Sequence, residues 1–173
     1  LAIRHPERVT GLVLARPAWL FEAAPSNMRP FIEIAHLLRT EAPMAARDRF
    51  AASPTARMLA REAPDNLVSL LKFFERPDPL LTADLVADIA LDGPGVTAAE
   101  AAAITVPTLV LGHGQDHVHP LAHAQALART IPGAHLVTIT PKAADKPRHV
   151  AEFRAALDTF LKQIPCAEAR PCP

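Results

Sequence analysis

Apolar residues change their spacing twice along the chain. Near the N-terminus, Val9–Ala15 is short and apolar almost throughout, which is typical of a strand buried on both faces. From about residue 20 to 103, the apolar positions follow helical spacing instead. One such helix is marked by four apolar residues at i, i+3, i+4 and i+7: Phe31, Ile34, Ala35 and Leu38. The pattern predicts a strand followed by a long helical block.

The C-terminal part returns to short strands that alternate with helices. Apolar runs predict strands at Thr108–Gly112 and Ala134–Ile139, and helical spacing predicts helices at Pro120–Thr130 and from Val150 onward. Because this alternation implies crossover connections, we expect a parallel sheet. The predicted fold class is α/β, with a partial parallel sheet and an inserted helical block. Ligands bind at the carboxyl ends of such strands, so a block inserted there would cover the site as a lid.

Two helix starts carry capping signals. Thr82 is a candidate N-cap for a helix that carries Leu85 and Ile89. Thr97 and Glu100 have the spacing of a capping box. We therefore expect one helix to begin after Thr82 and another after Thr97.

Composition and charge narrow the function classes. The 173 residues suit one domain, and an apolar fraction of 50% argues against disorder. Lys and Arg equal Asp and Glu at 18 each, so no net charge favours nucleic acid or a membrane surface, and no apolar run is long enough to span a bilayer. Both cysteines, Cys166 and Cys172, lie in the tail without metal-binding spacing. We expect free thiols, a reducing cytoplasm, and neither nucleic-acid nor membrane partners.

Four stretches resemble consecutive segments of the α/β-hydrolase family. "LAIRHPERVTGLVLARP" resembles the segment after the nucleophile elbow, and "ITVPTLVLGHGQDHVHP" resembles the strand and loop that carry the acid of the catalytic triad. "LARTIPGAHLVTI" and "FRAALDTFLKQ" resemble the last core strand with its preceding helix and the C-terminal helix.

The resemblance implies a domain organisation. Residues 1–19 and 104–164 would form the hydrolase core, residues 20–103 a helical cap, and residues 165–173 a flexible tail.

The family's nucleophile motif, G-x-S-x-G, is missing from the sequence. The three serines, Ser26, Ser53 and Ser69, all fall in the helical block, and none lies between glycines. We expect the elbow to lie just upstream of Leu1. The chain would then be the C-terminal portion of a hydrolase, inactive by itself.

The resemblance assigns the other two triad residues. Asp116 occupies the position of the acid, which fixes the tautomer of the histidine. The family usually has a Gly-His pair soon after the last strand, whereas this chain has "TPKAAD" there, and the nearest following histidine is His149. His149 would act as the general base. The alternatives are a turn aspartate that bonds its own backbone, and a surface histidine beside Arg148 at a helix N-terminus.

Other side chains near Asp116 suggest weaker candidates. Four histidines invite a metal interpretation, but their spacing matches no zinc pattern, so we expect no metal and instead solvated loop and helix histidines: His113, His117, His119 and His123. Of these, His117 or His119 would line the substrate cleft. Trp19 follows a strand end and is the best candidate to line an acyl pocket. The other aromatic residues of the block could line the same pocket, but at helical spacing such residues more often form an ordinary core: Phe21, Phe31, Phe73 and Phe74.

The resemblance implies hydrolysis of a small ester or related acyl bond, with no organic cofactor. An upstream serine would attack, His149 would shuttle the proton, and Asp116 would orient His149. One alternative is a non-catalytic relic or interaction module that self-associates through an open sheet edge. Another is a haloalkane- or epoxide-cleaving relative with an aspartate nucleophile.

Overall fold

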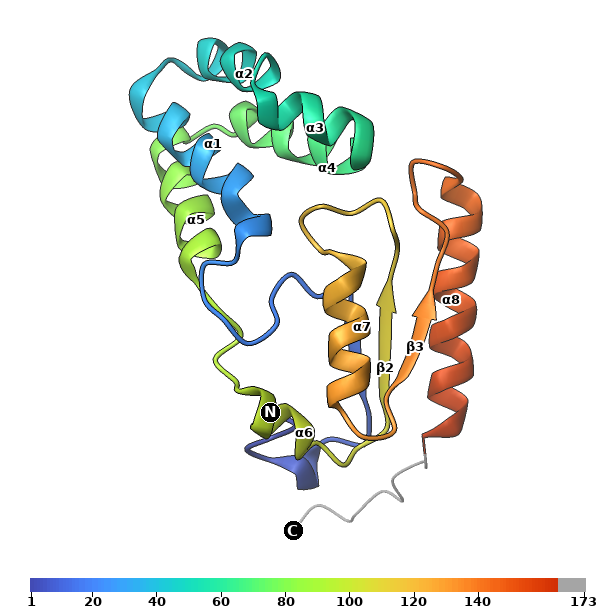
Figure 1. The fold of residues 1–173 in the computed structure, drawn as a ribbon. Helices are drawn as coiled ribbons and strands as arrows, with labels where there is room; N and C mark the ends of the chain where they lie inside the picture. The colour runs from blue at the N-terminus through green and yellow to red at the C-terminus, as the bar shows by residue number, and fades with distance from the viewer. Residues whose placement is uncertain (165–173) are drawn as a thin grey trace. The chain divides into compact units, whose positions relative to one another are not determined.

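The computed structural model describes residues 1–164, which form two compact units (Figure 1). The sheet unit comprises Leu1–Pro17, Val96–His113 and the described residues from Leu121 onward. The helical unit comprises Ala18–Gly95 and Gly114–Pro120. The loop after the central strand is therefore grouped with the helices.

The sheet unit is built on a parallel sheet, as the alternation of elements predicts. Its three described strands lie in the order β1-β2-β3: β1 (Leu12–Ala15), β2 (Thr108–Gly112) and β3 (His135–Thr138). In the register, Leu109 of β2 is aligned with Val13 of β1 and His135 of β3. Every residue of β2 is buried because this strand has a neighbour on each side.

The prediction for the first strand was partly wrong. β1 begins at Leu12 rather than Val9, and its residues are half-buried or exposed instead of buried on both faces. The physical reason is that β1 pairs with β2 alone among the described residues.

Two helices cover opposite faces of the sheet (Figure 1). The helices of this unit are the following: η1 (Pro6–Arg8), α6 (Ala98–Ala102), α7 (Leu121–Thr130) and α8 (Lys146–Gln163). Leu109 and Leu111 pack with Phe160 of α8. A Cβ added at Gly112 would lie 3.0 Å from the Cβ of Ala124, so α7 packs closely against Gly112, the residue after Leu111. Since successive strand residues point to opposite faces, α8 covers one face of β2 and α7 the other.

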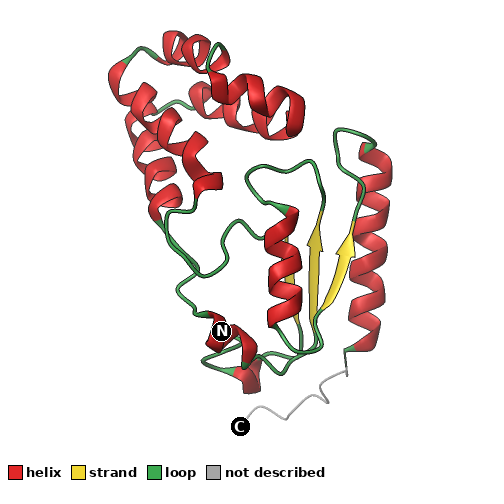
Figure 2. Cartoon of the chain, in the orientation of Figure 1, coloured by secondary structure: helices red, strands yellow, loops and turns green. Residues whose placement is uncertain are grey.

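Figure 2 draws all helices in red, the strands in yellow and the loops in green, and the helical unit contains no strand among its described residues. Its elements are η2 (Ser26–Met28), α1 (Arg29–Thr40), α2 (Pro43–Ala51), α3 (Pro54–Glu62), α4 (Pro64–Leu71), η3 (Lys72–Glu75) and α5 (Pro79–Leu91). Helices α2 to α5 each begin at a proline, whose missing N–H needs no partner in a first helical turn. All four apolar residues of the predicted α1 stripe are buried, and they form one core with Phe50, Leu59 and Phe74.

Of the two predicted helix starts, one is confirmed and one is wrong. Thr97 and Glu100 form the capping box, and the bonds from Thr97 hold the pKa of Glu100 below its ordinary value. Helix α5, by contrast, is capped by Asp78, whose side chain accepts from the N–H of Leu81. Thr82 lies inside α5, and its hydroxyl donates to the carbonyl of Asp78 at 2.6 Å.

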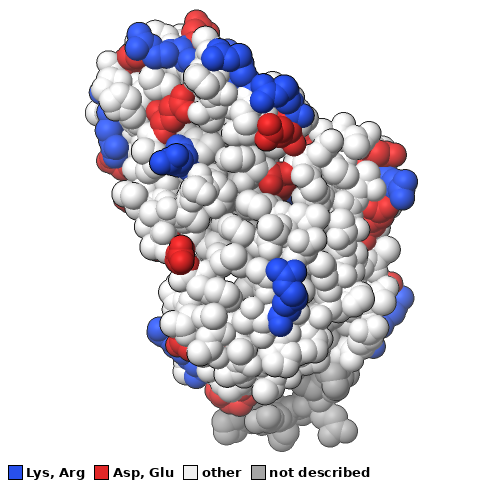
Figure 3. Space-filling model, in the orientation of Figure 1, with Lys and Arg blue, Asp and Glu red and all other residues white. Residues whose placement is uncertain are grey.

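Charged side chains of both signs are interspersed on the face that Figure 3 shows. In the helical unit, Arg39 pairs with Asp84 at 2.8 Å, and both side chains are exposed. Among helices α1 to α8 as described, none combines the length and the apolar character needed to cross a membrane.

Candidate active site

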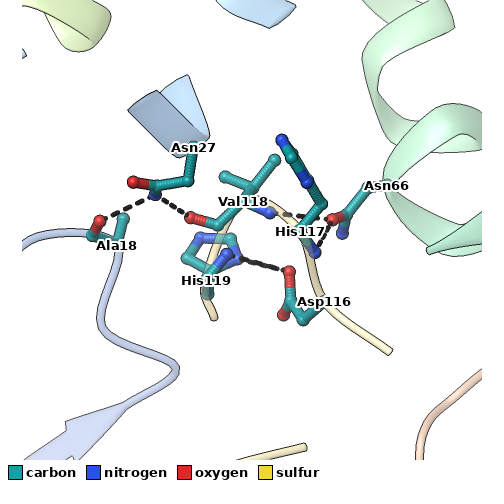
Figure 4. A network of polar contacts seen from close by, with 7 residues as sticks. All are labelled: Ala18, Asn27, Asn66, Asp116, His117, Val118 and His119. Carbon is teal, nitrogen blue, oxygen red and sulfur yellow. Dashed lines mark hydrogen bonds and ion pairs between the residues drawn. The ribbon is translucent and has the colours of Figure 1, made fainter. Parts of the chain in front are cut away.

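Asp116 lies in the loop that follows β2, here called the acid loop (residues 114–120). Its side chain is fully buried, with 0% exposed. The carboxylate Oδ1 accepts a hydrogen bond from the backbone N–H of His119 at 3.0 Å and lies 3.1 Å from the ring Nδ1 of His119 (Figure 4). Asp116 therefore does bond its own loop, as the alternative reading predicts.

Two buried asparagines from the helical unit hold the backbone of the acid loop (Figure 4). Asn66 Oδ1 accepts from the N–H groups of His117 at 2.7 Å and Val118 at 3.0 Å. Asn27 Nδ2 donates to the carbonyl oxygens of Val118 at 2.7 Å and Ala18 at 2.9 Å. Neither asparagine was predicted from the sequence, because an asparagine within a helical stretch carries no pattern of its own.

His149 lies in the first turns of α8, whose N-cap is Asp145. Its Nδ1 lies 2.8 Å from the carbonyl oxygen of Thr140. Because a carbonyl only accepts, this bond assigns the proton to Nδ1 and leaves Nε2 of the neutral ring as the acceptor nitrogen. His149 is thus held in the tautomer that a general base requires.

Thr140 is bonded to side chains of α8 through both its backbone N–H and its backbone carbonyl. While its carbonyl accepts from His149, its N–H donates to Glu152 Oε2 at 2.6 Å. Arg148 Nε donates to the other oxygen of Glu152, also at 2.6 Å. The Thr140 bond, followed by the Arg148 bond, lowers the pKa of Glu152 to about 2. An ionised Glu152 therefore holds the backbone N–H of Thr140, the residue whose carbonyl bonds His149.

His113, at the end of β2, was expected to be a solvated loop histidine, and this expectation was wrong. It is 2% exposed, because it directly follows the buried central strand. Its ring meets that of His149 edge to face, with the ring centroids 5.6 Å apart and the planes at 82°. The sheet unit therefore brings His113 and His149 together, while Asp116 belongs to the helical unit.

A pocket of about 320 Å³ in the helical unit reaches Asp116. The lining residues come from η2, the end of α3 and the acid loop: Ser26, Asn27, Glu62, Ala63, Gly114, Asp116, His117 and Pro120. His117, one of the predicted substrate-binding residues, is among them. The side chains of these residues include carboxylate, amide, hydroxyl and imidazole groups.

Trp19, the other predicted substrate-binding residue, is absent from that lining and packs partly buried against the helical core. Its indole N–H is buried and meets no acceptor within residues 1–164. Across the same residues, no three His, Cys, Asp or Glu side chains are grouped so that they could hold a metal ion. Cys166 and Cys172 lie outside the described residues.

No family model matches the sequence, and no curated protein matches it. Solved structures do match. The enol-lactonase from Burkholderia xenovorans LB400 is 25% identical, with a TM-score of 0.59 over 94% of this chain and 60% of that one. A hydrolase from Pseudomonas aeruginosa PA01 is 27% identical, with a TM-score of 0.57 over 93% and 58%. An α/β-hydrolase from a Medee basin deep-sea metagenome library is 16% identical, with a TM-score of 0.63 over 98% and 62%. The chain thus spans about 60% of the length of the structures that it matches.

Proposed function

Since the chain has the α/β-hydrolase fold over the part of that fold that it spans, we propose that it supplies the acid and the base of a hydrolytic triad. The observation that carries the proposal is the setting of His149. Its Nδ1–H is bonded to the Thr140 carbonyl, which leaves Nε2 as the basic nitrogen. Asp116 supports it as a fully buried carboxylate in the loop after the central strand.

The proposed reaction is hydrolysis of an ester or a related acyl bond in a small molecule. A serine outside residues 1–173 attacks the carbonyl carbon while His149 Nε2 takes the serine proton. His149 then gives this proton to the leaving oxygen, and an acyl-enzyme forms. Water, deprotonated by His149 in the same way, attacks the acyl-enzyme, which releases the acid and restores the serine. Asp116 stabilises the imidazolium that forms in both steps. The ester class is supported by the name of the enol-lactonase, because a lactone is a cyclic ester.

The proposal requires one hydrogen bond that differs from the described structure. A triad base donates its Nδ1–H to the acid, whereas His149 donates it to Thr140. The Nδ1–H of His149 must therefore change its acceptor, from the Thr140 carbonyl to the Asp116 carboxylate, in the working enzyme.

The first test uses the chain as given, with p-nitrophenyl butyrate as the probe. We expect no hydrolysis above background, because none of its serines has the elbow motif. If the chain hydrolyses the ester and His149→Ala abolishes this activity, a nucleophile lies within residues 1–173, and the proposal is wrong on that point. Ser26→Ala then tests the serine that shares a pocket with Asp116.

The second test extends the chain with the coding sequence upstream of Leu1. We expect an in-frame G-x-S-x-G and ester hydrolysis that falls by about 10⁴-fold in Asp116→Asn, as for the acid of a serine triad. His149→Ala should also abolish the reaction. Asp84→Asn is the matched control, because Asp84 is exposed and pairs only with Arg39 in the described contacts. An aspartate in the elbow would replace the ester reading with haloalkane or epoxide chemistry, and a stop codon directly upstream would refute the triad.

A further inference from the structure

We propose that Asn27 and Asn66 are positioning residues for Asp116, and that the helices, rather than strand β2, hold the acid loop. The functional part of this inference rests on the proposed role of Asp116. The structural part stands independently of it.

The first line of evidence is the number of bonds between the acid loop and the helical unit. Asn66, from α4, accepts from two consecutive N–H groups of the loop, those of His117 and Val118. Asn27, from η2, donates to the carbonyl of the same Val118. Both asparagines are nearly fully buried, at 5% and 7% exposed, so water does not offer easy replacements for these bonds. Val118 is thus bonded through both its backbone N–H and its backbone carbonyl.

The second line of evidence is how the loop joins β2. The strand ends at Gly112, and the buried His113 follows it. Next come Gly114 and Gln115, which are both exposed. A Cβ added at Gly114 would meet nothing within 4 Å, so this joint is not packed against its surroundings. Two exposed residues, Gly114 and Gln115, therefore lie between the buried end of the strand and Asp116.

The packing of Val118 also ties the acid loop to the helical unit. The side chain of Val118 is 5% exposed and belongs to the hydrophobic core of the helical unit. Asp116 in turn bonds the N–H of His119, the residue after Val118. The Asp116 carboxylate is therefore oriented by a backbone segment that is hydrogen-bonded to the helical unit and packed in its core.

The two asparagines act through opposite groups, which allows one substitution to test both. Asn66 works in these bonds as an acceptor, and an aspartate there still presents an oxygen to the two N–H groups. Asn27 works as a donor, and an aspartate there would place an oxygen against two carbonyl oxygens. We expect Asn66→Asp to preserve the acid loop and Asn27→Asp to release it.

The experiment is native-state hydrogen exchange by NMR on the full chain. In the wild type, the amides of His117 and Val118 should open together with those of α4 as denaturant is raised, and not with those of β2. This comparison needs no variant, so it stands even if a substitution prevents folding. Exchange of the loop amides in step with β2 would overturn the inference.

The variants add a second measurement. In Asn66→Leu, exchange at His117 and Val118 should accelerate by about tenfold or more, as expected for a lost hydrogen bond, while β2 amides keep their rates. Exchange at His119 should accelerate as well, because its N–H reports on the Asp116 carboxylate. Asn66→Asp should restore slow exchange, and Gly114→Ala should leave the exchange rates of His117 and Val118 unchanged, because a Cβ there meets nothing within 4 Å. Unchanged loop rates in Asn66→Leu would contradict the inference.

Activity measurements on the variants distinguish a failure of this inference from a failure of the proposed function. In the extended enzyme, Asn66→Leu should lower kcat with little change in KM, and Asn66→Asp should recover most of kcat. If Asp116→Asn leaves activity intact, the triad role of Asp116 is wrong, while the exchange data still decide what holds the loop. If Asp116→Asn abolishes activity and Asn66→Leu does not lower kcat, the positioning role is refuted.

Discussion

The bond between Glu152 and the Thr140 peptide gives a pH dependence whose sign and range can be worked out. Glu152 accepts from the Thr140 N–H and from Arg148, and these bonds lower its pKa to about 2. A depressed carboxyl pKa means that the folded state favours the ionised form. The stabilisation is complete above the unfolded pKa, near 4.3, and is lost as the pH falls through the folded value of about 2.

At pH 3, the ionised fraction of Glu152 differs greatly from that of an ordinary glutamate. With a pKa of about 2, roughly nine-tenths of Glu152 is still ionised there, whereas a glutamate with the ordinary pKa of about 4.3 would be only about one-twentieth ionised. We expect the side-chain carboxyl ¹³C resonance of Glu152 to titrate with a midpoint near 2, and the Thr140 amide proton to shift with the same midpoint. Glu152→Gln should remove the titration from the Thr140 amide, since a neutral amide replaces the carboxylate.

The variant Arg148→Met separates the two causes of the lowered Glu152 pKa, the Thr140 bond and the Arg148 bond. Since the Thr140 bond is the larger cause, this variant should raise the midpoint only part of the way toward the ordinary value. A wild-type midpoint near 4.3, or a Thr140 amide that is insensitive to Glu152, would refute the reasoning and with it the view that α8 fixes the peptide beside His149.

Two further substitutions test the packing and the capping. Val118→Ala removes two methyl groups from the helical core and should lower the free energy of unfolding by about 1.5–2.5 kcal/mol, whereas Val68→Ala, at a position that is 56% exposed, should change it by less than about 0.5 kcal/mol; equal effects in urea unfolding would contradict the burial of Val118. Asp78→Ala should cost about 1 kcal/mol as the loss of an N-cap, and Thr82→Ser should cost less because it keeps the hydroxyl; the reverse order in thermal denaturation would restore Thr82 as the cap.

Periodic patterns predicted the elements that the core depends on. The α1 stripe and the β2 strand were placed correctly because each buries a continuous apolar face, and burial is what hydrophobic periodicity records. The cap of α5 was misplaced for a local reason. Thr82 and Asp78 are both capping residue types, and Pro79 directly after Asp78 favours the earlier start, as a proline suits the first helical turn.

The surroundings of the candidate site were less accessible to the sequence. The family resemblance located Asp116 and His149, but it gave no indication of Asn27, which bonds a residue 91 positions away, or of Asn66, which bonds one 51 positions away. His113 was read as a solvated histidine because it stands among other loop histidines, although its place directly after a buried strand favours burial. Such contacts depend on tertiary structure, and no local spacing records them.

The acid loop and the loop between β3 and α8, which contains Thr140, need hydrogen-bond partners for the same reason. Each follows the carboxyl end of a strand, so its backbone groups leave the hydrogen-bond ladder and need other partners when they are buried. In both loops, helix side chains provide these partners: Asn27 and Asn66 for the backbone carbonyl and N–H of Val118, and His149 and Glu152 for those of Thr140. The same bonds that satisfy the backbone therefore hold the loop that carries Asp116, and they hold the ring of His149 against Thr140 in the described structure. If the helical unit holds the acid loop as proposed, a single polar substitution at Asn27 or Asn66 displaces Asp116 while the sheet remains intact.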